Sequence, residues 1–148
     1  MAAACPLCTS DGGRLVLRTP HWRLVHAGEA GYPGFYRLVW NAHVAEMSDL
    51  APAERRHCLE ALCSLEAAMR RHLRPQKMNM ASLGNQVPHL HWHLIARFEW
   101  DTHFPAPVWA AAVREPDAAR IAAVEARLPG LEQALRERLA ADGTMAST

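Results

Sequence analysis

Polar and hydrophobic residues alternate most regularly over residues 88–95, which read Pro-His-Leu-His-Trp-His-Leu-Ile. A period of two is typical of a strand with one buried face, because successive side chains of a strand point to opposite sides. The segment therefore predicts a strand over 88–96 whose apolar face packs against a core. On the opposite face three imidazoles would share one row: His89, His91 and His93.

Four further strands follow from the rest of the pattern. Short runs rich in strand-forming residues occupy residues 15–17, 21–26, 35–40 and 77–83. A turn at Gly84-Asn85 would pair the last of these with the histidine strand as a tight hairpin. The predicted fold class is α+β: a five-stranded, largely antiparallel sheet with a long helix on one face and C-terminal helices.

The long helix is expected between Pro52, which suits a first turn, and Pro75, which ends a helix. Residues at three- and four-residue spacing predict its core-facing stripe: Leu59, Leu62, Cys63, Glu66, Met69 and Leu73. We interpret Cys58 and Cys63 as buried, inert thiols in or near that stripe.

The C-terminal third has a different pattern. An irregular aromatic segment over 97–109 is interpreted as a flap or a dimer contact. Two alanine-rich helices are expected at 117–128 and 131–140, separated by Pro129-Gly130, before an end that frays. We therefore divide the chain into a domain over 1–112 and a helical extension over 113–148, which packs on the same globule or on a partner subunit.

Composition narrows the classes of function. The chain has 148 residues, enough for one domain, and its formal net charge is only +1, which argues against nucleic acid or membrane partners. No apolar run approaches the roughly 20 residues that span a bilayer, and the N-terminus lacks the features of a signal peptide. The expected location is therefore the cytoplasm, where the four cysteines are free thiols or metal ligands rather than disulfides.

The histidine row is the strongest chemical signal, since it holds three of the nine histidines. A neutral imidazole ligates metals, accepts protons or acts as a nucleophile. The row therefore fits a three-histidine catalytic zinc site, or one nucleophile with two neighbours that orient it. A solvated strand surface is the plainest alternative, and the clustering argues against it.

A second candidate site is Cys5-Pro-Leu-Cys8, which is half of a zinc site or a redox pair. No strand-helix-strand pattern surrounds it, so the redox interpretation is disfavoured. Zinc takes four ligands and often combines thiolates with imidazoles. The alternative is an unligated pair on a loosely ordered tail.

Residues 89–95 match the alternating histidine motif of the histidine triad (HIT) nucleotide hydrolases and transferases. The residues Asn79, Gly84 and Gln86 resemble the family's approach to this motif, and Trp40-Asn-Ala-His43 resembles its Pro-Lys-x-His segment. The cysteine pair resembles that of bacterial zinc-containing members, a type similar to diadenosine polyphosphate hydrolases. The landmarks cover residues 5 to about 109. The chain departs from the family at Phe35, Ala81 and Ala96.

This resemblance implies hydrolysis of a nucleotide, such as a dinucleoside polyphosphate or a nucleoside phosphoramidate, through a covalent nucleotidyl-histidine intermediate that releases a nucleoside monophosphate. A nucleotidyl transferase or phosphorylase and a decayed nucleotide-binding module are the alternatives. The implied catalytic residues are His91 as nucleophile, His93 and Asn79. The implied substrate-binding residues are Asn85, Gln86, Trp22 and Glu29, although Trp22 also fits a buried core. A structural zinc would be held by Cys5, Cys8, His43 and His89. The resemblance implies no organic cofactor, and it implies a homodimer.

Overall fold

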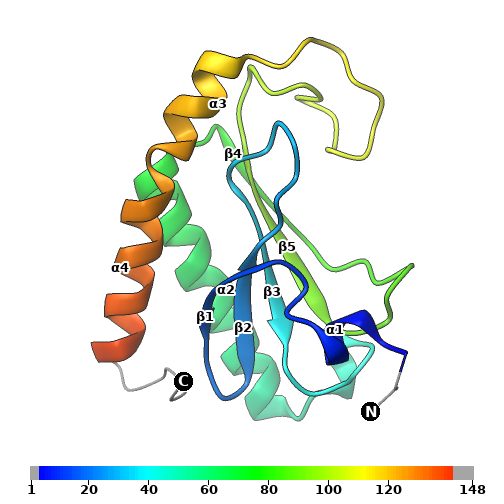
Figure 1. Cartoon of the computed structure of the whole chain (residues 1–148). Helices are drawn as coiled ribbons and strands as arrows, with labels where there is room; N and C mark the ends of the chain where they lie inside the picture. Colours follow the sequence, from blue (N-terminus) through cyan, green and yellow to red (C-terminus); the bar gives the residue numbers. More distant parts are fainter. Residues whose placement is uncertain (1–3, 142–148) are drawn as a thin grey trace.

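The computed structural model describes residues 4–141 as a five-stranded sheet with the longer helices on one face (Figure 1). The strand order is β1-β2-β3-β5-β4, and every neighbouring pair is antiparallel. The strands are β1 (Arg14–Arg18), β2 (Trp22–His26), β3 (Phe35–Trp40), β4 (Lys77–Ala81) and β5 (His91–Arg97). The predicted α+β fold class is confirmed, including the pairing of β4 with β5.

The long helix α2 (Pro52–Leu73) follows a 3-10 turn, η1 (Met47–Asp49), and packs on one face of the sheet. Its buried residues are Cys58, Leu62, Leu65, Met69 and Leu73. The predicted stripe was wrong at two positions: Leu59 is 50% exposed, and Cys63 is exposed rather than buried. Each residue of a helix turns by about 100°, so the side chain after Cys58 already points away from the sheet.

The C-terminal helices α3 (Ala118–Glu125) and α4 (Leu128–Ala141) share this core, and α4 runs beside α2 (Figure 1). Leu131 is fully buried in the same cluster as the α2 side chains. Pro129-Gly130 lies inside the first turn of α4 instead of separating two helices, because proline is tolerated where N–H groups have no helical partner. No helix within residues 4–141 is long and apolar enough to cross a bilayer. The end predicted to fray, 142–148, lies outside the described residues.

The opposite face of the sheet carries the short helix α1 (Pro6–Thr9). Here Cys5, Leu7, Val25 and Val39 form a small buried cluster, separate from the main core. The N-terminal segment therefore covers the part of this face that β2 and β3 form, but not the neighbouring part that β5 forms. We call this surface the site face.

Candidate functional site

The strand that carries the histidines begins later than predicted. β5 starts at His91 rather than at Pro88, and His89 lies in the preceding bend. The apolar half of the prediction is confirmed, because Leu90 and Leu94 are buried in the main core and Trp92 packs against it. The three histidines thus divide into one that points to the N-terminal segment and two that lie on β5.

His89 is fully buried and belongs to a four-residue cluster with Cys5, Cys8 and His43. Their ligand atoms all lie within 4.8 Å of one another. The two Nδ1 atoms are 3.2 Å apart, and the Cys8 sulfur lies 3.3 and 3.5 Å from Nδ1 of His43 and His89. A tetrahedral zinc with bonds of about 2.0–2.3 Å separates its ligand atoms by roughly 3.3–3.8 Å, so this geometry fits the ion.

The tautomer of His89 also fits a metal ligand. Its Nε2–H donates to the Trp40 carbonyl at 2.6 Å, which leaves the Nδ1 lone pair directed at the cluster. Among residues 4–141 this is the one group of three or more candidate ligands close enough to hold an ion. His91 and His93 are outside it, so the structure does not support a catalytic zinc bound by the three histidines of the motif.

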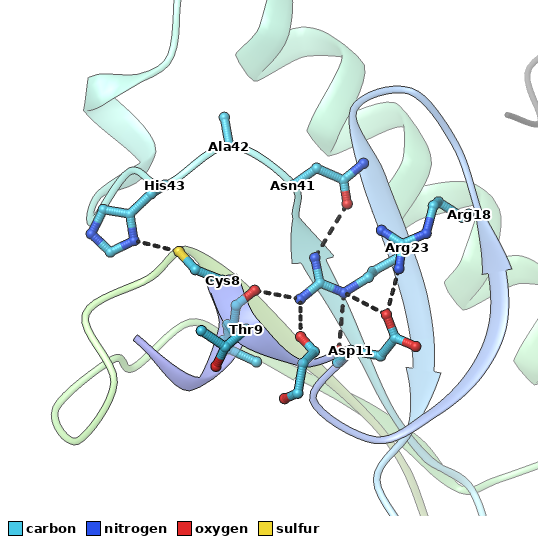
Figure 2. Close-up of a pocket in the computed structure, with 10 residues that line it drawn as sticks. Cys8, Thr9, Asp11, Arg18, Arg23, Asn41, Ala42 and His43 are labelled. Atoms are coloured by element: carbon cyan, nitrogen blue, oxygen red, sulfur yellow. Dashed lines mark hydrogen bonds and ion pairs between the residues drawn. The ribbon is translucent and has the colours of Figure 1, made fainter. Parts of the chain in front are cut away.

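Arg23 of β2 holds the N-terminal segment in place beside this cluster (Figure 2). Only 3% of the residue is exposed, and its guanidinium donates to the carbonyls of Leu7, Ser10 and Asp11 and to Asn41 Oδ1. Burial lowers the pKa of Arg23, and Arg18 lowers it further, whereas the Asp11 carboxylate raises it. The segment that brings Cys8 to His43 is therefore anchored by a buried cation that sequence reasoning missed.

His91 is oriented by the backbone. Its Nδ1 donates to the carbonyl of His89 at 2.6 Å, which selects the tautomer whose lone pair is on Nε2 when the ring is neutral. The next histidine of the row, His93, contacts it edge-to-face with ring centroids 5.1 Å apart. Burial lowers the pKa of His93 to about 4, with smaller effects from His91 and Arg37, so this ring is neutral at pH 7. Within the described chain, His93 Nδ1 is buried without a hydrogen-bond partner.

Both rings line a cavity of about 650 Å³ on the site face. The loop before β5 forms one wall and carries two of the predicted substrate-binding residues, Asn85 and Gln86. Gly84 has a φ of 77°, a left-handed conformation that favours glycine and turns the chain into this loop. The structure therefore brings four predicted site residues together: His91, His93, Asn85 and Gln86.

Two further residues line the cavity although sequence reasoning missed them. Arg37 lies directly across from His93 in the β3–β5 register, and the Trp109 ring contacts His93 with centroids 5.6 Å apart. Arg37 is the one charged residue in the apolar run of β3, which was an available signal. The sequence around Trp109 did not indicate its place at the cavity, since a flap and a dimer contact account equally well for an exposed tryptophan.

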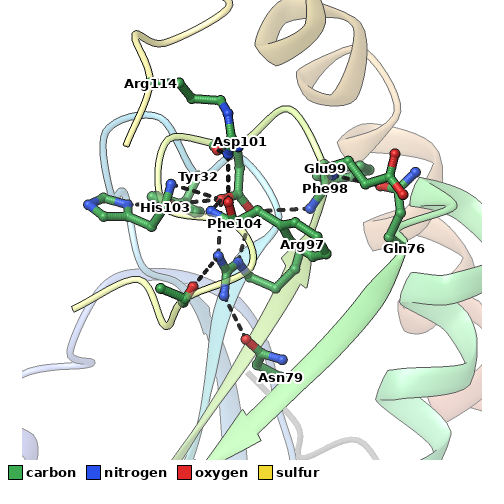
Figure 3. A network of polar contacts seen from close by, with 11 residues as sticks. Tyr32, Gln76, Asn79, Arg97, Phe98, Glu99, Asp101, His103, Phe104 and Arg114 are labelled. Atoms are coloured by element: carbon green, nitrogen blue, oxygen red, sulfur yellow. Dashed lines mark hydrogen bonds and ion pairs between the residues drawn. The ribbon is translucent and has the colours of Figure 1, made fainter. Parts of the chain in front are cut away.

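The segment after β5 is held by a buried ion pair (Figure 3). Arg97 and Asp101 are each 2% exposed, and the guanidinium donates to both carboxylate oxygens at 2.8 and 3.0 Å. Burial raises the pKa of Asp101, but hydrogen bonds from Arg97 and from backbone N–H groups outweigh it and hold that pKa below its ordinary value. Arg114 and Tyr32 also donate to Asp101, through its carbonyl and its carboxylate, so the residues leading to Trp109 are ordered from the end of β5.

Asn79 belongs to this ion-pair network rather than to the cavity. It pairs with Ile95 in the β4–β5 register, and its Oδ1 accepts from Arg97 at 2.8 Å. Asn79 lies on the same face of the sheet as the histidine row, as predicted, but its side chain does not line the cavity. The residue across from His93 on this side is Ala81, so Asn79 lies one step further along the hairpin.

The two remaining predicted substrate residues lie elsewhere. Trp22 is 3% exposed and packs in the main core with Trp40, across the sheet from the histidines. The interpretation as a buried core residue is therefore confirmed, and the assignment of Trp22 to substrate binding was wrong. The alternation of β2 accounts for this, since Arg23 takes the site face and Trp22 takes the other. Glu29 is exposed in the loop after β2 and is not part of the cavity lining.

With this geometry established, the comparisons identify the family. The model of the HIT domain matches residues 11–100, more than half of the chain. An antiparallel α+β domain with histidines on the sheet defines the class, and the chain belongs to the HIT family. A search of curated proteins found no match.

Solved structures agree with this assignment. The chain is similar to a histidine triad protein from Marinobacter aquaeolei, with a TM-score of 0.67 and 27% identity over 84% of this chain and 92% of that chain. A histidine triad protein from Bradyrhizobium japonicum gives 0.64 and 27%, over 79% and 91%. A Zn-bound histidine triad family protein from Mycobacterium smegmatis shares the fold at 0.56 and 19% identity, over 88% and 97%.

Proposed function

We propose that this HIT protein hydrolyses nucleotides by attack of His91 Nε2 on the α-phosphorus. The observation that carries the proposal is the hydrogen bond from His91 Nδ1 to the His89 carbonyl, which places the proton of the neutral ring on Nδ1 and its lone pair on Nε2, in a ring that lines the cavity. A neutral nitrogen with a free lone pair is the state that nucleophilic catalysis requires. Dinucleoside polyphosphates and nucleoside phosphoramidates are the candidate substrates.

The reaction has two displacements. In the first, the Nε2 lone pair forms a bond to phosphorus while the bond from phosphorus to the leaving group breaks, and the leaving group takes that electron pair. In the second, a water oxygen attacks phosphorus, loses a proton to solvent, and displaces Nε2. The products are the leaving group and a nucleoside monophosphate, and His91 returns to its starting state.

Neighbouring groups are suited to stabilise the charge that develops on the phosphate. The amides of Asn85 and Gln86 lie in the wall of the cavity and offer N–H donors. His93 is neutral at pH 7, so one ring nitrogen carries a proton that can bind the leaving atom. Such donors lower the barrier without a metal at the reaction centre.

The four-residue cluster is proposed to bind a structural zinc through Cys5, Cys8, His43 and His89. Four protein ligands fill a tetrahedral zinc and leave no position for a reacting water. When bound, the ion would crosslink the N-terminal segment to the bend before β5. His89 would then hold its carbonyl, the acceptor of the His91 proton, in a fixed position.

The test compares three alanine variants with one nucleotide substrate. We expect His91→Ala to abolish turnover and Gln86→Ala to lower kcat by roughly 100- to 1,000-fold, the usual cost of one stabilising donor. Asn79→Ala should cost less than either, because its side chain bonds to Arg97 rather than lining the cavity. Equal losses from His91→Ala and Asn79→Ala would contradict the assigned roles.

Protein incubated with labelled substrate and quenched in denaturant at alkaline pH, where a phosphorus–nitrogen bond to imidazole is stable, should carry an adduct at His91. A transferase would form the same adduct and pass the nucleotide to phosphate instead of water, so the product of a second incubation with phosphate separates the two. A binding module would bind nucleotide and form no adduct. The cytoplasmic location and the homodimer stay predictions.

A further inference from the structure

Four arginines of the sheet lie on the site face, and three of them are held by acceptors within the protein. Arg18, which lies across from Arg23, is paired with Asp11. Arg23 and Arg97 each donate four hydrogen bonds, to carbonyl, amide or carboxylate oxygens. Arg37 makes a single hydrogen bond, from Nη1 to the Gly12 carbonyl at 3.3 Å. A guanidinium has five N–H donors, so most of those on Arg37 are available to a ligand.

Arg37 also lacks a carboxylate partner in the described chain. No ion pair within residues 4–141 includes it, and Glu29, the acid whose charge acts on it, is exposed on a loop. The guanidinium is partly buried, with its carbon 5.5 Å from the Phe35 ring centroid. A partly desolvated cation without a counterion attracts anions more strongly than one in bulk water.

The position of Arg37 relates this cation to the reaction. It pairs with His93 across β3 and β5, and residues paired in this way have Cβ atoms about 4.5–5.5 Å apart. His91 precedes His93 in the same row, and both rings share the cavity with Arg37. A group bonded to the phosphorus held by His91, and directed towards His93, therefore reaches the guanidinium.

We propose that Arg37 is a specificity-determining residue that binds a second anionic group of the substrate, next to the phosphate attacked by His91. The preferred leaving group is then itself a phosphate or polyphosphate, and a substrate with an uncharged leaving group loses this contact. Arginine suits the role because its planar fork binds two phosphate oxygens at once. This inference rests on the proposed function.

Binding of inorganic pyrophosphate tests the subsite without requiring turnover. We expect Arg37→Gln to weaken binding by about 10- to 100-fold in titration calorimetry, the range for a hydrogen bond to a charged group. The matched control is Arg71→Gln, which removes the same charge from an exposed position on α2 and should leave the affinity unchanged. Equal affinity in the wild type and Arg37→Gln would overturn the proposal, provided thermal melting shows both folded.

Turnover then separates this inference from the proposed function. Two substrates share the adenylyl group: ATP, which leaves pyrophosphate, and the p-nitrophenyl ester of AMP, whose leaving group carries no phosphate. Arg37→Gln should lower kcat/KM by about 10- to 100-fold for ATP and by less than about threefold for the ester, and Arg37→Lys should retain part of the preference. Equal losses on both substrates would refute the role of Arg37. Absence of any adduct at His91 in the wild type would refute the proposed function, while the pyrophosphate result still decides the subsite.

Discussion

The two ends of β5 are stabilised in opposite ways. Just before the strand, His89 meets two cysteines and a second histidine, whose ligand atoms converge within 4.8 Å. At its far end, Arg97 meets Asp101, and their charges compensate each other at 2.8 Å. The first group brings together lone pairs that a bound cation would have to compensate, whereas the second group contains its own cation, Arg97. With the proposed zinc bound, the chain would have an ion-dependent anchor and an ion-independent anchor on one strand.

The difference matters because His91 and His93, the proposed reactive pair, lie between the anchors. The metal-ligand cluster fixes the carbonyl that orients His91, and the Arg97–Asp101 pair orders the segment that leads to Trp109 and the His93 side of the cavity. Loss of either anchor should therefore affect a different part of the site.

Removal of the metal should have the largest effect. If zinc is present at about 10,000 times its Kd, its loss to a chelator lowers the free energy of unfolding by about 5.5 kcal/mol. Cys8→Ser should lower both the zinc content, measured by metal analysis, and the free energy of unfolding, measured in urea. The matched control is Cys63→Ser, because Cys63 is an exposed cysteine on α2. If the purified protein contains no zinc and a chelator does not change its stability, the ion-dependent anchor is refuted.

Substitution of Asp101 should have a somewhat smaller effect on stability. Asp101→Asn leaves Arg97 as a buried cation without its counterion, which costs about 3–5 kcal/mol in urea unfolding. Glu115→Gln is the matched control, since Glu115 is exposed and should change stability by less than about 0.5 kcal/mol. Chelator should destabilise Asp101→Asn and the wild type equally, because the anchors share no residues; a strongly non-additive result would show that they are coupled.

Acid should produce the smallest effect, and only at the ion-pair end. The pKa of Asp101 in the folded protein is below the ordinary value of 3.8, so the group stabilises the fold above that pH. This contribution to the free energy of unfolding is lost as the pH falls below 3.8 and then below the pKa of Asp101 in the folded protein. The difference in unfolding free energy between wild type and Asp101→Asn should therefore shrink between pH 5 and pH 3. Glu132, whose pKa is also lowered, is present in both proteins and cancels. A constant difference would show that the carboxylate charge is not what stabilises this end.

Local periodicity was a good guide to the faces of the strands and a poorer guide to what each side chain does there. The alternation around His91 correctly separated the reactive row from the buried leucines, and the cysteine pair with its two histidines converged as the family resemblance implied. The helix stripe was displaced by one position at Leu59, because three- and four-residue spacings fit more than one register. Which register is buried depends on the sheet beneath it.

By itself, the sequence determined the fold class and the family and singled out the histidine row, because periodicity and motif spacing are properties of neighbouring residues. Only the tertiary structure decided which polar groups are already satisfied. Arg23, Arg37 and Arg97 look alike in their strands, yet two are saturated by distant backbone and side-chain oxygens and one faces the cavity. Hydrogen bonds between segments far apart in the chain make that distinction, and no local pattern encodes them.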